Sequence, residues 1–169
     1  DGSTEAVAGI EAFLRRPHPY VAIDTETTGV SWGDVVRTVQ IGDSEDGWVI
    51  PAAFDQIIAH VVRSVPKFIA WNMAFDAVHL SRVAHLPFDT VIAKMRDTAV
   101  LAGVLDPRAE HQGGVGRGLK PWAIRLCGEG AGVFEDERKR YFRKAGVSWE
   151  NCDWRTPILV RYAGSDPVL

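Results

Sequence analysis

The chain has 169 residues, of which 46% are hydrophobic and 24% charged, so it is long enough for one domain with a buried core and has neither a disordered nor a fibrous composition. No apolar run approaches the ~20 residues that span a bilayer, so no membrane span is expected. The formal net charge is −3 and the first five residues are acidic and polar, unlike a signal peptide. We therefore expect a cytoplasmic protein without a membrane partner.

The first ninety residues predict strands followed by an alternation of helix and strand. Ser3 or Thr4 is expected to cap a first helix, which Pro17 ends. Runs of β-branched and aromatic residues between turn-forming residues predict strands over 20–25, 35–41, 48–50 and 67–71. Apolar residues at helical spacing predict helices over 54–62 and 73–84.

The second half of the chain is predicted to be mainly helical. A helix is expected over 90–105, followed by a glycine-rich loop over 106–118. Later helices are expected to break near 128–132 and 146–157, and Thr156 and Pro157 suit the N-cap and first position of a last helix. Because strands come early and helices late, we expect an α/β fold in layers, with one domain over 1–169.

Acidic residues stand at three places of unusual pattern. Asp24 and Glu26 end a predicted strand, and the two-residue period puts both side chains on one face. Asp76 lies in the first turn of a helix that directly follows a strand, and Tyr162 and Asp166 share a helix face at a four-residue spacing. Each has a plain structural explanation when taken alone: a solvated strand end, an acid at a helix N-terminus, and a core tyrosine near an exposed acid.

Together, the four carboxylates suggest a metal site. If they converge, bound cations explain their joint burial, since like charges repel and are costly to desolvate. Oxygen ligands favour Mg²⁺ or Mn²⁺, and two such ions ~4 Å apart support in-line phosphoryl displacement. The five histidines have neither H-x-x-x-H nor H-E-x-x-H spacing, and the chain lacks a GxxxxGK[ST] motif, so nucleotide-triphosphate hydrolysis has no support.

In order and separation, these segments resemble the motifs of the DEDD superfamily of 3′→5′ exonucleases, in its tyrosine branch. Residues 23–29 (IDTETTG) are similar to the first motif, residues 72–76 (NMAFD) to the second, and Tyr162 with Asp166 to the third. Within the superfamily the chain looks most like the proofreading domain of bacterial and bacteriophage family A (polymerase I-type) DNA polymerases. The resemblance implies an RNase H-like (DnaQ-like exonuclease) fold, in which helices flank a mixed central sheet.

The resemblance also implies a role for each motif residue. Asp24 would bridge two ions, Mg²⁺ or Mn²⁺, while Glu26 and Asp166 would complete the first metal site. Asp76 would hold the second ion, and Tyr162 would orient the attacking water. The expected contacts to DNA are the backbone around Thr25 and Thr27, Val30 as an apolar wedge against the last base, Asn72 and Lys120.

The implied function is hydrolysis of the terminal phosphodiester of single-stranded or mismatched DNA 3′ ends, as proofreading for a DNA polymerase. A polymerase module could follow Leu169 in the same chain, and we expect a monomer. An RNase D-like RNA exonuclease with the same chemistry is an alternative. A catalytically inactive module that binds nucleic acid or scaffolds a polymerase is another, although the intact acid set with Tyr162 argues against it.

Three further features bear on this interpretation. Pro167 directly follows Asp166, so the last helix should kink or restart there. Trp71 and Phe75 are expected to pack in the core, with stacking of Trp71 on a base as the alternative. The basic run 138–144 is expected to be a solvated helix face paired with the acids 135–137, with a phosphate track as the alternative.

Overall fold

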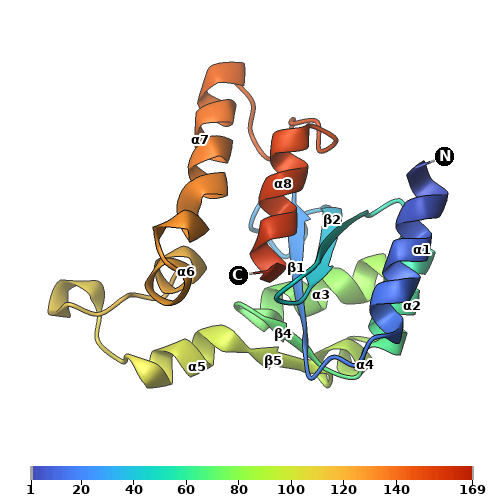
Figure 1. Cartoon of the computed structure of the whole chain (residues 1–169), viewed down its shortest axis with the longest axis horizontal. Helices are drawn as coiled ribbons and strands as arrows, with labels where there is room; N and C mark the ends of the chain where they lie inside the picture. The colour runs from blue at the N-terminus through green and yellow to red at the C-terminus, as the bar shows by residue number, and fades with distance from the viewer. Residues whose placement is uncertain (1, 169) are drawn as a thin grey trace.

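The structure, a computed structural model that describes residues 2–168, is built on a five-stranded mixed sheet with helices on both faces (Figure 1). The strand order is β3-β2-β1-β4-β5. Strands β1, β2 and β3 pair antiparallel, whereas β1, β4 and β5 pair parallel. This confirms the predicted fold class, and the arrangement is compatible with an RNase H-like fold. The strands are β1 (Val21–Thr27), β2 (Val36–Gly42), β3 (Gly47–Pro51), β4 (Phe68–Ala70) and β5 (Met95–Asp97).

Helices connect and cover these strands. In chain order they are α1 (Gly2–Arg15), α2 (Asp55–Ser64), α3 (Met73–Val83), α4 (Phe88–Ile92), α5 (Thr98–Leu105), α6 (Leu119–Cys127), α7 (Val133–Ala145) and α8 (Pro157–Ser165). Short 3₁₀ turns occur at η1 (Glu110–Gln112), η2 (Glu129–Gly132) and η3 (Asp166–Val168). Among the described residues, no helix has the length and apolar character needed to cross a bilayer.

The two faces of the sheet differ in chemistry. Along β1, Val21, Ile23 and Thr25 point to one face, and Asp24 and Glu26 point to the other, as the strand period requires. The first face packs against α1, α2 and α3 and forms the main core, where each fully buried aliphatic side chain stabilises the fold by roughly 1.5–3 kcal/mol. Members of this core include Ile10, Phe13, Ile23, Ile41, Ile58, Val61 and Leu80.

Helix α8 lies close against the second face, because two glycines allow it. A Cβ added to Gly47 of β3 would meet the carbonyl oxygen of Gly164, and a Cβ on Gly164 would touch Val49. The side chain of Val49 lies on the same face as Gln40 and Asp24, since β1, β2 and β3 are in register at these residues. The end of α8 is thereby placed over the acidic half of β1.

Most predicted elements match the structure to within two residues, but two predictions were wrong. The single helix expected over 90–105 is two helices, α4 and α5, separated by strand β5. Met95 in this strand is buried, and Lys94 just before it donates hydrogen bonds to three carbonyls at the end of α2, so tertiary pairing overrides the helical spacing. Ser3 and Thr4 lie inside α1, which begins at Gly2, and not at the N-cap position.

The predicted break at Pro167 is confirmed. Helix α8 ends at Ser165, and Asp166 begins the 3₁₀ turn η3. The predicted start of α8 is also confirmed, with Thr156 at the N-cap position and Pro157 as its first residue. Because proline lacks an N–H, the α-helical hydrogen bonding of α8 does not continue through Pro167, although the backbone of Asp166 itself remains helical.

Candidate metal and nuclease site

Three carboxylates converge on the second face of the sheet. Asp24 and Glu26 project from β1, and Asp166 projects from the start of η3. One oxygen of each lies within 4.8 Å of an oxygen of the other two. Side chains from two segments some 140 residues apart in the sequence thus form one acidic cluster, which we call the carboxylate triad.

Asp76 lies beside the triad rather than within it. It stands in the first turn of α3, is 3% exposed, and accepts a hydrogen bond of 2.7 Å from the Thr25 hydroxyl. Thr25 neighbours Asp24 in β1, so this bond ties the start of α3 to the strand that carries the triad. The charge of Asp76 is close enough to act on the Asp24 carboxyl.

The protons of these four groups are held more tightly than in water. Burial, reinforced by the charges of Asp76, Glu26 and Asp166, raises the pKa of Asp24 well above its ordinary value. Burial and the charge of Asp166 raise the pKa of Glu26 to about 8, and burial raises the pKa of Asp76 to about 7. Burial likewise raises the pKa of Asp166. A cluster of this kind is costly without a cation between its members.

Lys120 of α6 supplies one such positive charge. Its ammonium group contacts the Asp166 carboxylate, and both side chains are largely buried. The ammonium also lies 5.3 Å from the centre of the Tyr162 ring. From the sequence, Lys120 was expected to contact nucleic acid. In the structure it is the counter-ion of Asp166, a carboxylate of the triad.

Tyr162 belongs to the same constellation. It lies on α8 one turn before Asp166 and is 9% exposed, and its hydroxyl is close enough to the Asp166 carboxyl to oppose the rise in the pKa of that group. Burial and the nearby carboxylates raise the pKa of this hydroxyl well above its usual range. The hydroxyl therefore stays protonated at neutral pH and can donate to an oxygen at the triad.

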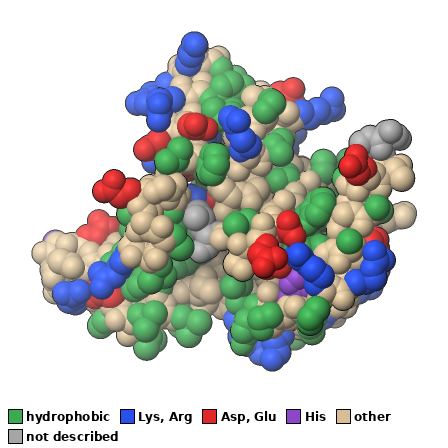
Figure 2. Space-filling model, in the orientation of Figure 1, with side chains coloured by type: hydrophobic (Ala, Val, Ile, Leu, Met, Phe, Trp, Pro, Cys, Tyr) green, Lys and Arg blue, Asp and Glu red, His purple; other side chains and the backbone are tan. Residues whose placement is uncertain are grey.

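The basic run 138–144 on α7 divides into two parts. Arg140, Arg143 and Lys144 are exposed, and Figure 2 shows Lys and Arg side chains gathered over the far end of α7, as expected of a solvated face. Arg138 pairs with Glu135, which confirms the predicted pairing with the preceding acids. Its side chain is only 11% exposed, so the prediction of a solvated face was wrong for this residue. Its charge also lowers the pKa of Glu26 and so reaches the triad.

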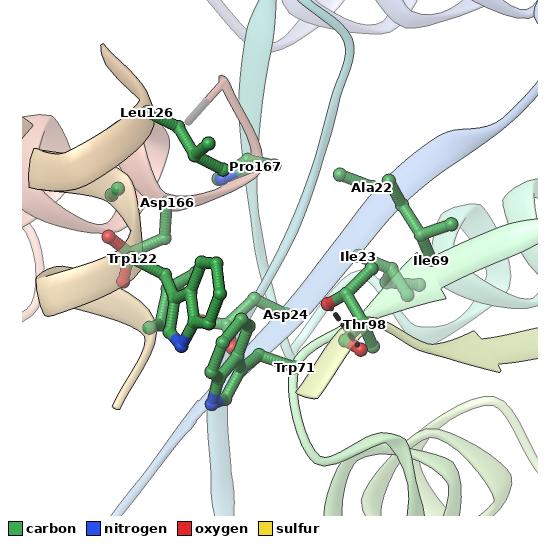
Figure 3. A pocket seen from close by; sticks show the side chains of 13 residues that line it. Ala22, Ile23, Asp24, Ile69, Trp71, Thr98, Trp122, Leu126, Asp166 and Pro167 are labelled. Atoms are coloured by element: carbon green, nitrogen blue, oxygen red, sulfur yellow. Dashed lines mark hydrogen bonds between the residues drawn. The ribbon is translucent and has the colours of Figure 1, made fainter. Parts of the chain in front are cut away.

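A cavity of about 250 Å³ opens beside Asp24 and Asp166 (Figure 3). The indoles of Trp71 and Trp122 form part of its wall. Each indole N–H donates to a carbonyl of the glycine-rich loop, from Trp71 to Arg117 at 3.1 Å and from Trp122 to Gly116 at 2.9 Å. Trp71 is half-buried at this wall, so the prediction that it packs in the core was wrong. The sequence did not predict that Trp122 lines a cavity.

The remaining predicted residues lie in different settings. Val30, beyond the end of β1, is 93% exposed, as an apolar contact for a ligand requires. The hydroxyl of Thr27 donates to the Gly29 carbonyl, so the Thr25 and Thr27 side chains both bond within the protein. Phe75 is half-buried, with its ring 4.4 Å from that of His79 and 5.9 Å from that of Trp32.

Asn72 adopts an unusual backbone conformation. Its φ of 61° is left-handed, and its N–H donates to the Asp97 carboxylate at 3.1 Å. Asparagine tolerates this region better than most residues, and such strained positions occur often at functional sites. The Asn72 side chain remains exposed at the start of α3.

The donor set of the triad fits a hard divalent cation. All of its ligand atoms are carboxylate oxygens, which Mg²⁺ and Mn²⁺ prefer, and they are close enough together to contact one ion. The carboxyl pKa values are raised despite the positive charges of Lys120 and Arg138, which indicates an excess of negative charge that a cation would relieve. The residues present are therefore compatible with divalent metal binding.

Comparison with known proteins relates the chain to DNA polymerases. It is 26% identical over 179 aligned residues to a DNA polymerase of Mycobacterium phage L5, in a match that covers 98% of this chain and 30% of that protein. It is 25% identical to a DNA polymerase of Mycobacterium phage D29 over 98% of this chain and 29% of that protein. Half of the chain is 39% identical to 15% of DNA polymerase I of Aquifex aeolicus.

The chain spans less than a third of the length of these phage relatives. No family model matches it. The similarity thus relates the chain to one part of phage and bacterial DNA polymerases.

Proposed function

We propose that the chain is a divalent-metal-dependent 3′→5′ exonuclease module that edits DNA ends for a polymerase. The observation that carries the proposal is the carboxylate triad with Asp76 and Tyr162 beside it, an arrangement suited to phosphodiester hydrolysis. Similarity to DNA polymerases supports DNA over RNA as the substrate. A polymerase module is the partner that we propose.

Each residue has a part in the proposed reaction. Asp24, Glu26 and Asp166 would hold one divalent ion, and Asp24 with Asp76 would hold a second. When bound, such ions activate water and stabilise the leaving oxygen of the phosphodiester. Tyr162, whose hydroxyl lies at Asp166, would orient the attacking water. Lys120 would then leave Asp166 and be available to a phosphate of the bound strand.

An unpaired 3′ end is the substrate that we propose. The triad lies on a sheet face partly covered by α8, so a single strand would reach it more readily than a duplex end, with Val30 against the last base. A paired end must first melt, at about 1.4 kcal/mol of stacking per step. Separating about three pairs would cost roughly 4 kcal/mol, or on the order of a thousandfold in the bound fraction. A mismatched end has already met part of this cost, so editing requires no reading of base identity.

The test is single-turnover hydrolysis of 5′-labelled DNA by the wild type, Asp24→Ala and Asp136→Ala. Asp136 is an exposed acid of α7 outside the site and serves as the matched control. We expect shortening from the 3′ end in Mg²⁺ or Mn²⁺, no activity in excess EDTA, and loss of activity in Asp24→Ala alone. Cleavage by Asp24→Ala at the wild-type rate would refute the proposal.

Substrate choice is tested with three DNA ends and one RNA strand. We expect single-stranded and mismatched ends to be cut faster than paired ends. Equal rates on all three would contradict the proposed editing role. Faster hydrolysis of RNA than of DNA would favour the RNase D-like alternative instead.

A further inference from the structure

Arg138 lies against the ring of Tyr162 although the two residues belong to different helices. Helices α7 and α8 run side by side in Figure 1 and contact each other. The guanidinium carbon is 5.0 Å from the centre of the Tyr162 ring and 4.6 Å from that of the Trp149 ring. Phe142, one turn further along α7, has its ring centre 5.3 Å from the same carbon. The guanidinium thus lies against three aromatic rings, of which Trp149 contacts both of the others.

Hydrogen bonds to Glu135 fix the orientation of this guanidinium. Glu135 accepts two hydrogen bonds from it, from Nη2 at 2.7 Å and from Nε at 3.2 Å. A planar fork held at two points cannot rotate freely, unlike the ammonium group of a lysine. Trp149 is itself held in place, because it stacks on Trp154 with ring centres 5.0 Å apart and planes 13° apart.

The position of the Tyr162 ring decides where its hydroxyl lies. In the proposed reaction this hydroxyl must remain beside Asp166. The Lys120 ammonium is the other cation at this ring, but it is shared with Asp166, which we propose as a metal ligand. When Lys120 leaves Asp166, Arg138 and Trp149 remain to hold the ring in position.

We propose that Arg138 is a positioning residue of the exonuclease site, which, packed against the rings of Trp149 and Tyr162, keeps the Tyr162 hydroxyl beside Asp166. The catalytic part of this inference rests on the proposed function. Arg138 does not need to touch the substrate, and its buried guanidinium differs in this from the exposed Arg140 and Arg143 on the same helix. Misplacing a reacting group by about 1 Å can cost on the order of a hundredfold in rate.

A double-mutant cycle tests the proposal. Arg138→Met keeps an unbranched apolar stem and removes the fork and the charge. We expect it to lower the single-turnover rate about 10- to 100-fold, with KM for single-stranded DNA unchanged. In a Tyr162→Phe background the same substitution should lower the rate less than about twofold, because the hydroxyl that it positions is already gone. An equal loss in both backgrounds, or a rise in KM with an unchanged rate, would overturn the proposal.

Further variants separate positioning from charge. Arg138→Lys should not restore the wild-type rate, since an ammonium group cannot make the two-point contact with Glu135 while it stacks. Arg140→Met, on the exposed face of α7, is the matched control and should leave the rate unchanged. If Arg138→Met does not fold, Glu135→Gln is the substitute, because it weakens the hydrogen bonds to the guanidinium but leaves Arg138 in place. It should lower the rate in the wild-type background more than in the Tyr162→Phe background.

Fluorotyrosine NMR gives a readout that does not depend on activity. The chain has three tyrosines, Tyr20, Tyr141 and Tyr162, so incorporation of 3-fluorotyrosine gives three resonances that Tyr→Phe variants assign. In Arg138→Met we expect the Tyr162 resonance to shift and broaden while that of Tyr20 stays fixed. An unchanged Tyr162 resonance overturns the positioning role. A shifted Tyr162 resonance in a protein without nuclease activity supports the contact and refutes the proposed function instead.

Discussion

Replacing Glu26 with glutamine measures what the acidic cluster costs the fold. Glu26 is 9% exposed, and its pKa is raised from 4.5 to about 8 by burial and by the charge of Asp166. At pH 7 the unfolded chain releases this proton, whereas the folded protein must retain it. Because pH 7 lies well above the ordinary pKa of 4.5, retaining this proton costs the folded state about 3 kcal/mol, at 1.36 kcal/mol per pKa unit. Glu26→Gln removes this cost and keeps the shape of the side chain.

The direction of the pKa shift decides how stability changes with pH. A carboxyl whose pKa is raised on folding binds more protons in the folded state, so stability falls as pH rises. The contribution is fully present below about pH 4.5 and is lost as pH rises through about 8. The metal-free wild type should therefore become less stable over this window, and the variant should show a weaker dependence.

Thermal and urea unfolding in EDTA and in Mg²⁺ is the assay. In EDTA at pH 7 we expect Glu26→Gln to exceed the wild type by about 2–3 kcal/mol, or roughly 5–10 °C in Tm. Mg²⁺ at a hundred times its Kd should stabilise the wild type by about 2.7 kcal/mol and the variant by less. The difference in stability between the two proteins should therefore be smaller in Mg²⁺ than in EDTA. Glu45→Gln, an exposed acid, is the control and should change stability by less than about 0.5 kcal/mol. A variant less stable than the wild type in EDTA would refute this reasoning.

Three other substitutions probe different parts of the structure. Lys120→Met should lower stability in EDTA by about 1–3 kcal/mol, because it leaves Asp166 unpaired, and should tighten Mg²⁺ binding measured by calorimetry; weaker binding would contradict the placement of Lys120. Gly47→Val should destabilise the fold by about 2 kcal/mol or more and so lower the urea midpoint, because the added side chain meets Gly164. An unchanged midpoint would show that α8 can move away. Val30→Ala should leave Tm within about 1 °C and slow single-turnover cleavage; a wild-type rate would remove Val30 from the proposed site.

Local pattern was enough to predict much of the fold. Asp24 and Glu26 share a face because a strand alternates, and α8 gives way to a 3₁₀ turn at Asp166 because Pro167 cannot continue an α-helix. Both arguments need only neighbouring residues. The order of the strands in the sheet and the approach of α8 depend instead on contacts such as that between Gly47 and Gly164, which no local pattern indicates.

The errors arose where distant residues decide the outcome. The region 90–105 has helical spacing, yet Met95 pairs with Phe68 of β4, and this pairing makes the segment a strand. Arg138 follows the acids 135–137 like any solvated helix residue, and only Trp149 and Tyr162, which follow it in the chain, show that it is enclosed. Burial of a charged side chain depends on tertiary partners that the sequence does not place.

The left-handed backbone at Asn72 has a consequence for how substitutions at this position would be selected. Glycine adopts a φ of 61° without strain, aspartate and asparagine with little, and β-branched residues with great difficulty. A library of all residues at position 72, sorted for folded protein alone, would thus retain glycine, asparagine and aspartate. The same library sorted for DNA cleavage would retain asparagine alone if its amide contacts the strand, and glycine as well if only the bend matters. The difference between the two surviving sets separates the demand of the backbone from that of the substrate.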